Sequence, residues 1–381
     1  MAVTWPDGVR SSGVASGIKP NGALDLGVLT LDRPGSWAAT FTKNGAAAAP
    51  VEWSRALVGR PLRGVVVNSG NANACTGAAG AEAVRATAEA AAGLLSCSPQ
   101  EIGVASTGPI GVHLPVDNLL RGLPAAVRQL TRDTGPFSEA ILTTDTRSKL
   151  ARVTADGFEV TGVAKGAAML APNMATMLAF VATDAAVDGI ALQQVLTRAV
   201  RRSFDRISVD ACESTNDSVF LLSSGTAHGV DEESFAAAVE DVCRDLAEQM
   251  VRDAEGGSKI VRIRVAGAED EDAAVALAKG VAGSILWRAA VHGGDPNWGR
   301  VAAALGAVDR KLDLCDVVIR LGPEVVFRSG EPAAPTSAAA RALAGDEVLV
   351  HCTVGSGGAG VEVLTTDLSP VYVTLNAAGT S

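Results

Sequence analysis

Apolar and polar residues follow two different periods along the chain. Short runs rich in β-branched residues, typical of strands, occupy residues 63–68, 157–164, 176–183, 218–224, 259–265, 316–321, 347–354 and 371–376. Alanine-rich segments with apolar residues three and four positions apart, typical of amphipathic helices, occupy residues 79–95, 188–204, 232–254 and 271–284. Strands and helices do not alternate one for one. The pattern therefore predicts an α+β fold with helices packed on mixed β-sheets, and it disfavours a doubly wound parallel sheet.

Composition and charge narrow the function classes. The chain has 381 residues, 48% of them hydrophobic, and a net charge of -10, so we expect a large core and no nucleic-acid partner. The sequence begins without the basic start and apolar run of a signal peptide, and we find no membrane-spanning pattern. We therefore expect a cytoplasmic protein with no membrane partner. The six cysteines and four histidines lack metal-ligand spacing, which predicts no metal site.

A glycine-rich motif near the C-terminus has the spacing of a nucleotide-binding loop but not its flanking elements. The segment "GSGGAG" at 355–360 fits the spacing of a dinucleotide-binding loop. Such a loop joins a strand to a helix, whereas the residues that follow, "VEVLTTDL", have the pattern of a strand. We therefore predict a hairpin turn here and no dinucleotide cofactor.

The stretch "KGAAMLAPNMATMLAFVATDA" at 165–185 carries a threonine, Thr176, inside an apolar run. A buried threonine most often hydrogen-bonds the backbone, and Thr176 alone fits that interpretation. The preceding proline and asparagine, however, predict a turn, so that a strand begins at Thr176. A threonine hydroxyl is a weak nucleophile that needs a neighbouring base. Cleavage between Ala175 and Thr176 creates one, because the new α-amine titrates at roughly 7.7 to 8.0.

Several motifs, taken in their order along the chain, resemble those of one protein family. They are "GIKPNGALDLGVL", "VNSGNANACTG", "ASTGPIGVHLP", "LTTDTRSK", "KGAAMLAPNMATML", "STNDS", "RDAEGGSK" and "HGGDPNWGR". With these motifs the sequence closely resembles the ornithine acetyltransferase family, also called glutamate N-acetyltransferases, which act in arginine biosynthesis. The resemblance covers nearly the whole chain and is far more specific than any single motif.

The resemblance implies a fold, a processing step and a reaction. The fold is the self-cleaving N-terminal-threonine acyltransferase fold of that family. Cleavage between Ala175 and Thr176 gives an α chain of residues 1–175 and a β chain of residues 176–381, which assemble as α2β2. Thr176 takes the acetyl group of N-acetylornithine, releases ornithine and passes the acetyl group to glutamate. No cofactor is implied, and the sequence leaves open whether acetyl-CoA is also a donor.

The same resemblance assigns residues to the site. Thr107 and Gly108 in "STGPIG" form the oxyanion hole by a hydroxyl and a backbone N–H, beside the nucleophile Thr176. The substrate-binding residues are Thr143, Lys165, Thr176, Glu255, Asn376 and Ser381. Lys165 and Glu255 offer opposite charges, which suit the carboxylate and the amino group of an amino acid. Taken alone, they would equally fit a surface lysine and the end of an amphipathic helix.

Three departures from the family pattern leave the substrate pair open. Glu213 precedes "STND", Trp287 stands where a lysine is common, and Gly379 replaces an aromatic residue near the end of the chain. The alternatives are a paralogue that uses related acyl amino acids in a specialised pathway, and a self-processing aminopeptidase or amidohydrolase that gives its acyl group to water. An uncleaved binding protein of the same fold is a further alternative.

Overall fold

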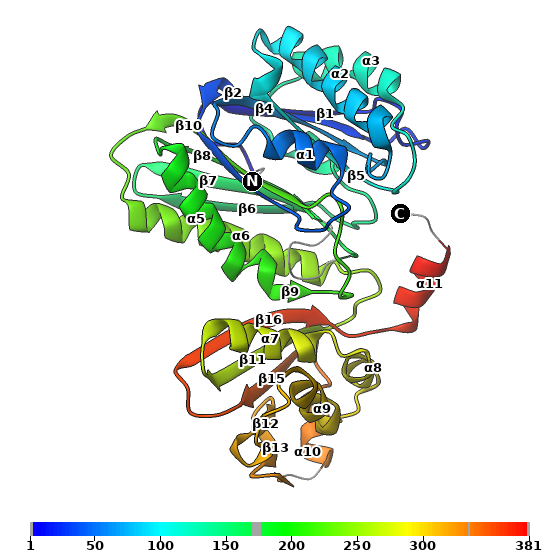
Figure 1. Cartoon of the computed structure of the whole chain (residues 1–381), viewed down its shortest axis with the longest axis vertical. Helices are drawn as coiled ribbons and strands as arrows, with labels where there is room; N and C mark the ends of the chain where they lie inside the picture. The colour runs from blue at the N-terminus through cyan, green and yellow to red at the C-terminus, as the bar shows by residue number, and fades with distance from the viewer. Residues whose placement is uncertain (1–2, 170–176, 334–335, 379–381) are drawn as a thin grey trace. The chain divides into compact units, whose positions relative to one another are not determined.

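The computed structural model describes residues 3–169, 177–333 and 336–378. The chain forms two compact units (Figure 1). Of the described residues, the first unit comprises those up to Asp205 together with Cys212–Met250, and the second comprises Arg206–Ala211 and residues 251–378. In each unit helices pack on β-sheets around a hydrophobic core, which confirms the predicted α+β fold.

Two β-sheets form the first unit. The four-stranded sheet has the order β1 (Val9–Val14), β2 (Leu26–Gly35), β4 (Leu62–Ser69) and β5 (Ile102–Thr107). The five-stranded sheet has the order β3 (Trp37–Phe41), β10 (Ser218–Ala227), β8 (Leu178–Ala185), β7 (Phe158–Lys165) and β6 (Lys149–Ala155). The pairs β4–β5 and β8–β10 are parallel and the other pairs antiparallel, so both sheets are mixed.

The two sheets of the first unit pack face to face. Leu29 and Val65 of the four-stranded sheet belong to the same buried cluster as Phe180 and Phe220 of the five-stranded sheet. The rings of Phe180 and Phe220 stack with their centroids 5.5 Å apart. Aromatic pairs of this kind add to the stabilisation that burial itself provides. This inter-sheet core fixes the positions of the strand ends from which the site is built.

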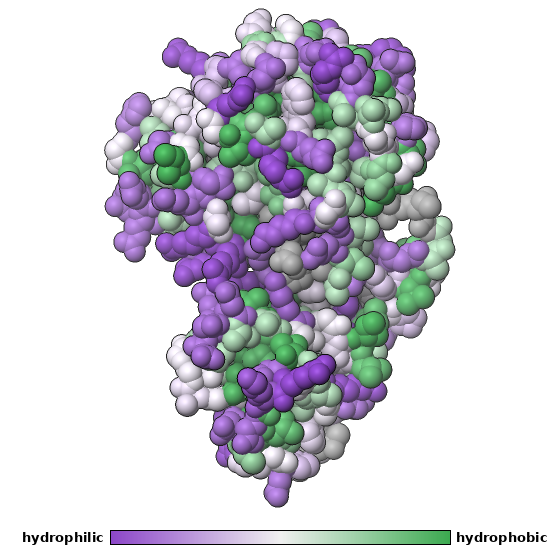
Figure 2. Space-filling model, in the orientation of Figure 1, coloured by the Kyte–Doolittle hydropathy of each residue, from purple (hydrophilic) through white to green (hydrophobic). Residues whose placement is uncertain are grey.

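Helices cover the outer faces of both sheets. α2 (Gly77–Leu95) and α3 (Val116–Arg128) pack on the four-stranded sheet, and α1 (Ala49–Arg55) and α4 (Gly135–Ala140) contact β5 and β1. α5 (Gly189–Arg202) packs on β3, and α6 (Glu232–Arg252) packs on β7, where Gly162 leaves room for Val242. The surface around α5 and α6 is mainly hydrophilic, as amphipathic helices require (Figure 2).

β8 is the central strand of the five-stranded sheet. Six of its eight residues, Leu178–Thr183, are buried without interruption. A strand that is covered on both faces cannot alternate apolar and polar residues, so it has a continuous apolar sequence. The run "LAFVAT" is therefore explained by the layer in which it lies.

A single mixed sheet organises the second unit. Its order is β14 (Glu331–Pro332), β13 (Glu324–Arg328), β12 (Val318–Leu321), β15 (Glu347–Thr353), β11 (Ile260–Ala268), β16 (Ala359–Thr366) and β9 (Ile207–Ser208). The helices are α7 (Glu271–Ala282), α8 (Ile285–Gly293), α9 (Trp298–Val308), α10 (Thr336–Arg341) and α11 (Pro370–Ala378). β15 alternates buried residues with residues that are partly or fully exposed, as a strand with one face on the core does.

Helices α7 and α9 contribute to the core of the second unit. Leu277 and Val281 of α7 and Leu305 of α9 are buried against the sheet. Among the described residues no single helix is long and apolar enough to cross a membrane. α7 and α8 meet that test only as a pair, and a bend of 56° separates them.

Two local predictions were wrong. Residues 371–376 form part of the helix α11 and not a strand. The Ser369 hydroxyl accepts the N–H groups of Val371 and Tyr372, and Pro370 occupies the first turn, so a cap and a proline override the alternating pattern. The glycine-rich segment 355–360 is not a hairpin turn. It connects β15 and β16, which do not pair with each other but flank β11.

The sheet order predicts how a chain cleaved before Thr176 behaves. The α chain would supply β3, β6 and β7 to the five-stranded sheet, and the β chain would supply β8 and β10. The pairs β7–β8 and β3–β10 therefore join the two chains through backbone hydrogen bonds and buried side chains. We expect the fragments to co-elute in native size-exclusion chromatography and to separate in denaturant. Separation under native conditions would contradict this arrangement.

Candidate active site

Lys165 is the centre of a polar cluster in the first unit. It is the last residue of β7, and its side chain is only 2% exposed. Its Nζ donates hydrogen bonds to Thr143 Oγ1 at 2.7 Å and to Thr107 Oγ1 at 3.3 Å. Thr107 is the last residue of β5, so the ends of strands from both sheets meet here. Three residues that the sequence assigned to the site from separate motifs thus lie together.

Asp145 compensates the charge of this cluster. Its carboxylate is fully buried and accepts hydrogen bonds from Lys149 Nζ at 2.6 Å and from the Gly166 N–H at 2.6 Å. Lys165 Nζ lies 3.7 Å from its other oxygen. Burial alone would raise the pKa of Asp145, but the two ammonium groups outweigh burial and lower this pKa to about 2. Asp145 is therefore ionised at neutral pH.

Burial acts on Lys165 in the opposite sense. Removal from water lowers the pKa of its ammonium group, while the Asp145 carboxylate resists that change. Two lysines share one aspartate in this cluster, so an anionic ligand would be favoured next to Lys165. Asp145 and Lys149 were not assigned to the site from the sequence. Their signal was an acid and a base four residues apart in "DTRSK", which also fits an ordinary surface pair.

Gly108 has a backbone conformation that requires glycine. Its φ is +143°, and a Cβ at this position would lie 2.4 Å from the Asn71 backbone nitrogen. No side chain fits there, so the turn after β5 depends on the absence of a Cβ. The requirement for glycine at position 108 is therefore steric. The turn leaves Gly108 next to the Thr107 hydroxyl.

The motif "NSGNANACTG" supports this turn. The Asn71 N–H donates to the Thr107 carbonyl at 3.0 Å, and the Asn71 side chain donates to the carbonyl of Val112 at 3.1 Å. From "STNDS", Asn216 Nδ2 donates to the carbonyls of Ala72 at 2.6 Å and Ser106 at 2.9 Å. These side-chain amides donate hydrogen bonds to backbone carbonyls at both ends of the turn, at Ala72, Ser106 and Val112. Their role is to hold Thr107 and Gly108 in place.

The proposed cleavage site lies outside the described residues. Ala175 and Thr176 both fall in the range 170–176, and the chain is described again from Met177. The Met177 N–H donates to Asp217 Oδ1 at 2.9 Å, and the Met177 carbonyl accepts the Ser218 N–H at 3.2 Å. The residue after Thr176 is therefore held on both of its backbone groups. Ser381 also lies outside the described residues.

Glu255 and Asn376 form a separate pair in the second unit. Asn376 lies on α11, and its Nδ2 donates to Glu255 Oε2 at 2.9 Å. Glu255 Oε1 is buried without a hydrogen-bond partner within the described part of the chain. Two further residues that the sequence assigned to substrate binding thus contact each other. They lie in a different unit from Lys165.

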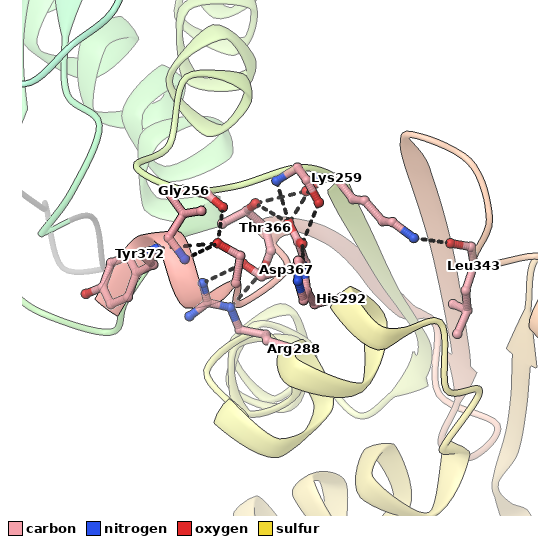
Figure 3. A network of polar contacts seen from close by, with 11 residues as sticks. Gly256, Lys259, Arg288, His292, Leu343, Thr366, Asp367 and Tyr372 are labelled. Atoms are coloured by element: carbon pink, nitrogen blue, oxygen red, sulfur yellow. Dashed lines mark hydrogen bonds and ion pairs between the residues drawn. The ribbon is translucent and has the colours of Figure 1, made fainter. Parts of the chain in front are cut away.

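A network of polar contacts surrounds Asp367 in the same unit (Figure 3). The buried Asp367 carboxylate accepts hydrogen bonds from the N–H and hydroxyl of Ser258, both at 2.7 Å, and lies 2.7 Å from His292 Nδ1. Arg288 Nε donates to the Thr366 carbonyl at 2.7 Å. Burial alone would raise the pKa of Asp367, but these hydrogen bonds outweigh it and lower the pKa. The network joins the "AEGGSK" loop to the segment before α11.

Two of the three residues that depart from the family pattern lie in the described part of the chain. Trp287 is fully buried in the core of the second unit, and its Nε1 has no hydrogen-bond partner among the described residues. Glu213 is exposed, and Asn44 Nδ2 donates to its backbone carbonyl at 3.4 Å. Gly379 lies outside the described residues.

The fold and the buried cluster define an α+β enzyme with a polar site at strand ends. The ArgJ family model matches residues 10–381, and the chain belongs to this family. The arginine biosynthesis bifunctional protein ArgJ of Thermus thermophilus is 43% identical over 383 residues, covering 100% of both chains. That of Thermobifida fusca is also 43% identical, over 99% of both chains. The crystal structure of the arginine biosynthesis bifunctional protein ArgJ from Bacillus halodurans matches 52% of this chain and 98% of its own at 33% identity, with a TM-score of 0.50.

The charge state of Asp145 predicts a pH dependence of stability. The folded-state pKa, about 2, is lower than the ordinary value of 3.8, so ionised Asp145 stabilises the fold above about pH 4. This contribution, roughly 2 kcal/mol, is lost as pH falls from about 4 towards 2. In urea unfolding, we expect Asp145→Asn to lose several kcal/mol at pH 7 and to depend less on pH than wild type.

An exposed carboxylate provides the control. Asp32 pairs with Arg10, and both side chains are about half exposed. We expect Asp32→Asn to change the free energy of unfolding by at most about 1 kcal/mol and to keep the wild-type pH dependence. Equal pH dependence in wild type and Asp145→Asn would contradict the ionised, buried state of Asp145.

Proposed function

We propose that the protein is a glutamate N-acetyltransferase that moves an acetyl group from N-acetylornithine to glutamate. Membership of the ArgJ family and the relatives named for arginine biosynthesis support this reaction. The observation that carries the proposal is the cluster of Lys165, Thr143 and Thr107, which unites residues from three motifs at the ends of two sheets. The chain first cleaves itself between Ala175 and Thr176, which gives Thr176 a new α-amine.

The first half-reaction forms an ester on Thr176. The α-amine takes the hydroxyl proton while Thr176 Oγ attacks the acetyl carbonyl carbon of N-acetylornithine. The carbon–nitrogen bond then breaks, and the proton passes to the nitrogen of the leaving ornithine. In the second half-reaction, the amine of glutamate attacks the ester carbonyl. The bond to Thr176 Oγ breaks, the hydroxyl regains a proton, and N-acetylglutamate leaves.

Each half-reaction passes through a tetrahedral intermediate with a negatively charged oxygen. Thr107 Oγ1 and the Gly108 N–H are the proposed donors to this oxygen. The steric requirement for glycine at 108 supports this role, because the turn keeps a backbone N–H beside a fixed hydroxyl. Lys165 next to Thr107 adds positive charge on the same side.

The charges of Lys165 and Glu255 suggest how the amino-acid substrates are recognised. Lys165 and Thr143 are the proposed partners of the substrate carboxylate, because a buried ammonium group with one shared counter-ion favours an added anion. Glu255, Asn376 and Ser381 keep the substrate-binding roles that the resemblance implies. The buried Oε1 of Glu255 has no hydrogen-bond partner among the described residues, which supports a contact with a cationic amino group. We also propose an α2β2 assembly and a cytoplasmic location.

Intact mass spectrometry under denaturing conditions tests the proposal. Wild type and Thr176→Ala are compared, and wild type is measured again after brief incubation with N-acetylornithine. We expect two fragments that divide at Ala175 and Thr176 in wild type only, and the β fragment should gain one acetyl group. Added glutamate should remove the acetyl group and yield N-acetylglutamate. Acetyl-CoA is tested as a second donor in the same way.

The outcomes separate the alternatives. Cleavage without acetylation would retain self-processing but assign the protein other acyl amino acids. Rapid loss of the acetyl group without glutamate would indicate a hydrolase. An uncleaved wild-type chain would contradict the mechanism.

A further inference from the structure

A polar clamp in the second unit joins two segments, residues 255–259 and 366–372 (Figure 3). The N–H and the hydroxyl of Ser258 both donate to the Asp367 carboxylate at 2.7 Å. The Lys259 N–H donates to the same carboxylate at 3.0 Å. Asp367 is only 1% exposed, so these hydrogen bonds are shielded from water. The loop that follows Glu255 is therefore fastened to the segment that leads into α11.

Ser369 extends the clamp to the first turn of α11. Its side chain is 4% exposed, and its hydroxyl accepts the N–H groups of Val371 at 3.1 Å and Tyr372 at 3.3 Å. These two contacts are those of a helix cap. The same hydroxyl also donates to the Gly256 carbonyl at 2.6 Å, which a cap does not require. Because a hydroxyl has one donor and two acceptor positions, all of its capacity is used here.

The two glycines of "AEGG" allow this close approach. Gly256 has a φ of +66°, and a Cβ there would lie 2.3 Å from the Tyr372 backbone nitrogen. A Cβ at Gly257 would lie 2.3 Å from Thr366 Oγ1. Any side chain at either position would push the two segments apart. The glycines are therefore explained by the contact of the loop with the start of α11.

The clamp determines where α11 places Asn376. None of the described residues of α11 is buried, so packing in a core does not fix this helix within the unit. Asn376 Nδ2 donates to the Tyr372 carbonyl at 3.0 Å and to Glu255 Oε2 at 2.9 Å. Glu255 Oε1 is buried and has no hydrogen-bond partner in the described part of the chain. One oxygen of this carboxylate is thus held by the helix, and the other suits an added cation.

We propose that Ser369 and Gly256 are positioning residues for substrate binding. They hold α11 against the loop after Glu255, so that the Glu255 carboxylate is arranged in advance for the ammonium group of an amino-acid substrate. A group that is already in place loses less conformational entropy when the ligand binds. This inference rests on the proposed function, in which Glu255 and Asn376 bind substrate.

A pair of glycine variants tests the close approach. Gly330 is the matched control, because its φ is +78° and a Cβ there would meet only Cys315 Sγ at an ordinary 3.9 Å. Both alanine variants therefore carry the same kind of backbone strain, but only Gly256→Ala displaces α11. Binding of ornithine to the full-length protein is measured by calorimetry. We expect the Kd to rise at least about tenfold in Gly256→Ala and to stay within about twofold of wild type in Gly330→Ala.

A pair of serine variants separates the clamp from an ordinary helix cap. Ser284 caps α8 in the same unit by accepting the Trp287 N–H at 3.3 Å. Ser369→Ala removes a cap and the contact with Gly256, whereas Ser284→Ala removes a cap alone. We expect Ser369→Ala to bind ornithine about tenfold more weakly and Ser284→Ala to bind it as wild type does. In acetyl transfer, Ser369→Ala should raise the KM for glutamate and leave kcat within about threefold.

A double-mutant cycle with Glu255→Gln excludes a purely structural role. If Ser369 acts through Glu255, adding Ser369→Ala to Glu255→Gln should weaken ornithine binding by less than about twofold further. Losses that multiply would mean that Ser369 acts independently of Glu255, and would overturn the proposal. Wild-type affinity in Ser369→Ala would overturn it as well.

The remaining outcomes are also decisive. If circular dichroism shows that Gly256→Ala does not fold, the milder Ser369→Ala and its cycle decide the question. Failure of the proposed function is distinguishable, because wild type itself would then neither bind ornithine nor transfer acetyl groups, and the inference would fall with it. If wild type binds ornithine and Ser369→Ala binds it equally well, only the present inference fails.

Discussion

The buried carboxylate of Asp145 is the interaction on which the arrangement of the site depends. Two lysines cannot be removed from water without a counter-charge, and this single aspartate contacts one ammonium group and lies near the other. It also accepts the Gly166 N–H, so the loop after α4 is fastened to the end of β7. Thr143 and Lys165 are brought into contact as a consequence. The positive charge that suits a carboxylate substrate is therefore part of the folded structure.

The sheet arrangement supplies the second constraint. The segment that carries the proposed nucleophile leads directly into β8, the central strand of a sheet that is covered on both faces. Parallel pairing with β10 and antiparallel pairing with β7 hold that strand from both sides. A break in the chain just before this strand therefore leaves the core contacts in place. The described chain is held from Met177 onwards by hydrogen bonds to Asp217 and Ser218.

Much of the fold could be predicted from the sequence, because most strands and helices have clear periods. The runs 63–68 and 157–164 correspond to β4 and β7, and the alanine-rich run 79–95 corresponds to α2. The prediction failed at 371–376, where the alternation of a strand is overridden by Ser369 and Pro370. Side-chain periodicity cannot show a cap that lies just outside the window.

The residues of the candidate site also divide into those that could be assigned from the sequence and those that could not. Thr107, Gly108, Thr143 and Lys165 could be assigned because short motifs surround them, and the structure gives three of them a shared contact. Asp145 could not be assigned from the sequence. Its ionised state depends on Lys165 and on the Gly166 N–H, which belong to a later segment of the chain. Such contacts exist only once the sheets have formed.

Isotope exchange tests the central claim, the acetyl-Thr176 intermediate, most directly. Purified enzyme is incubated with N-acetylornithine and labelled ornithine in the complete absence of glutamate and acetyl-CoA. A double displacement predicts that label enters N-acetylornithine, because the acetyl-enzyme can return its acetyl group to any ornithine that binds. Thr176→Ala should show no exchange. If wild type transfers acetyl groups to glutamate but exchanges no label without it, transfer is direct and the covalent intermediate is contradicted.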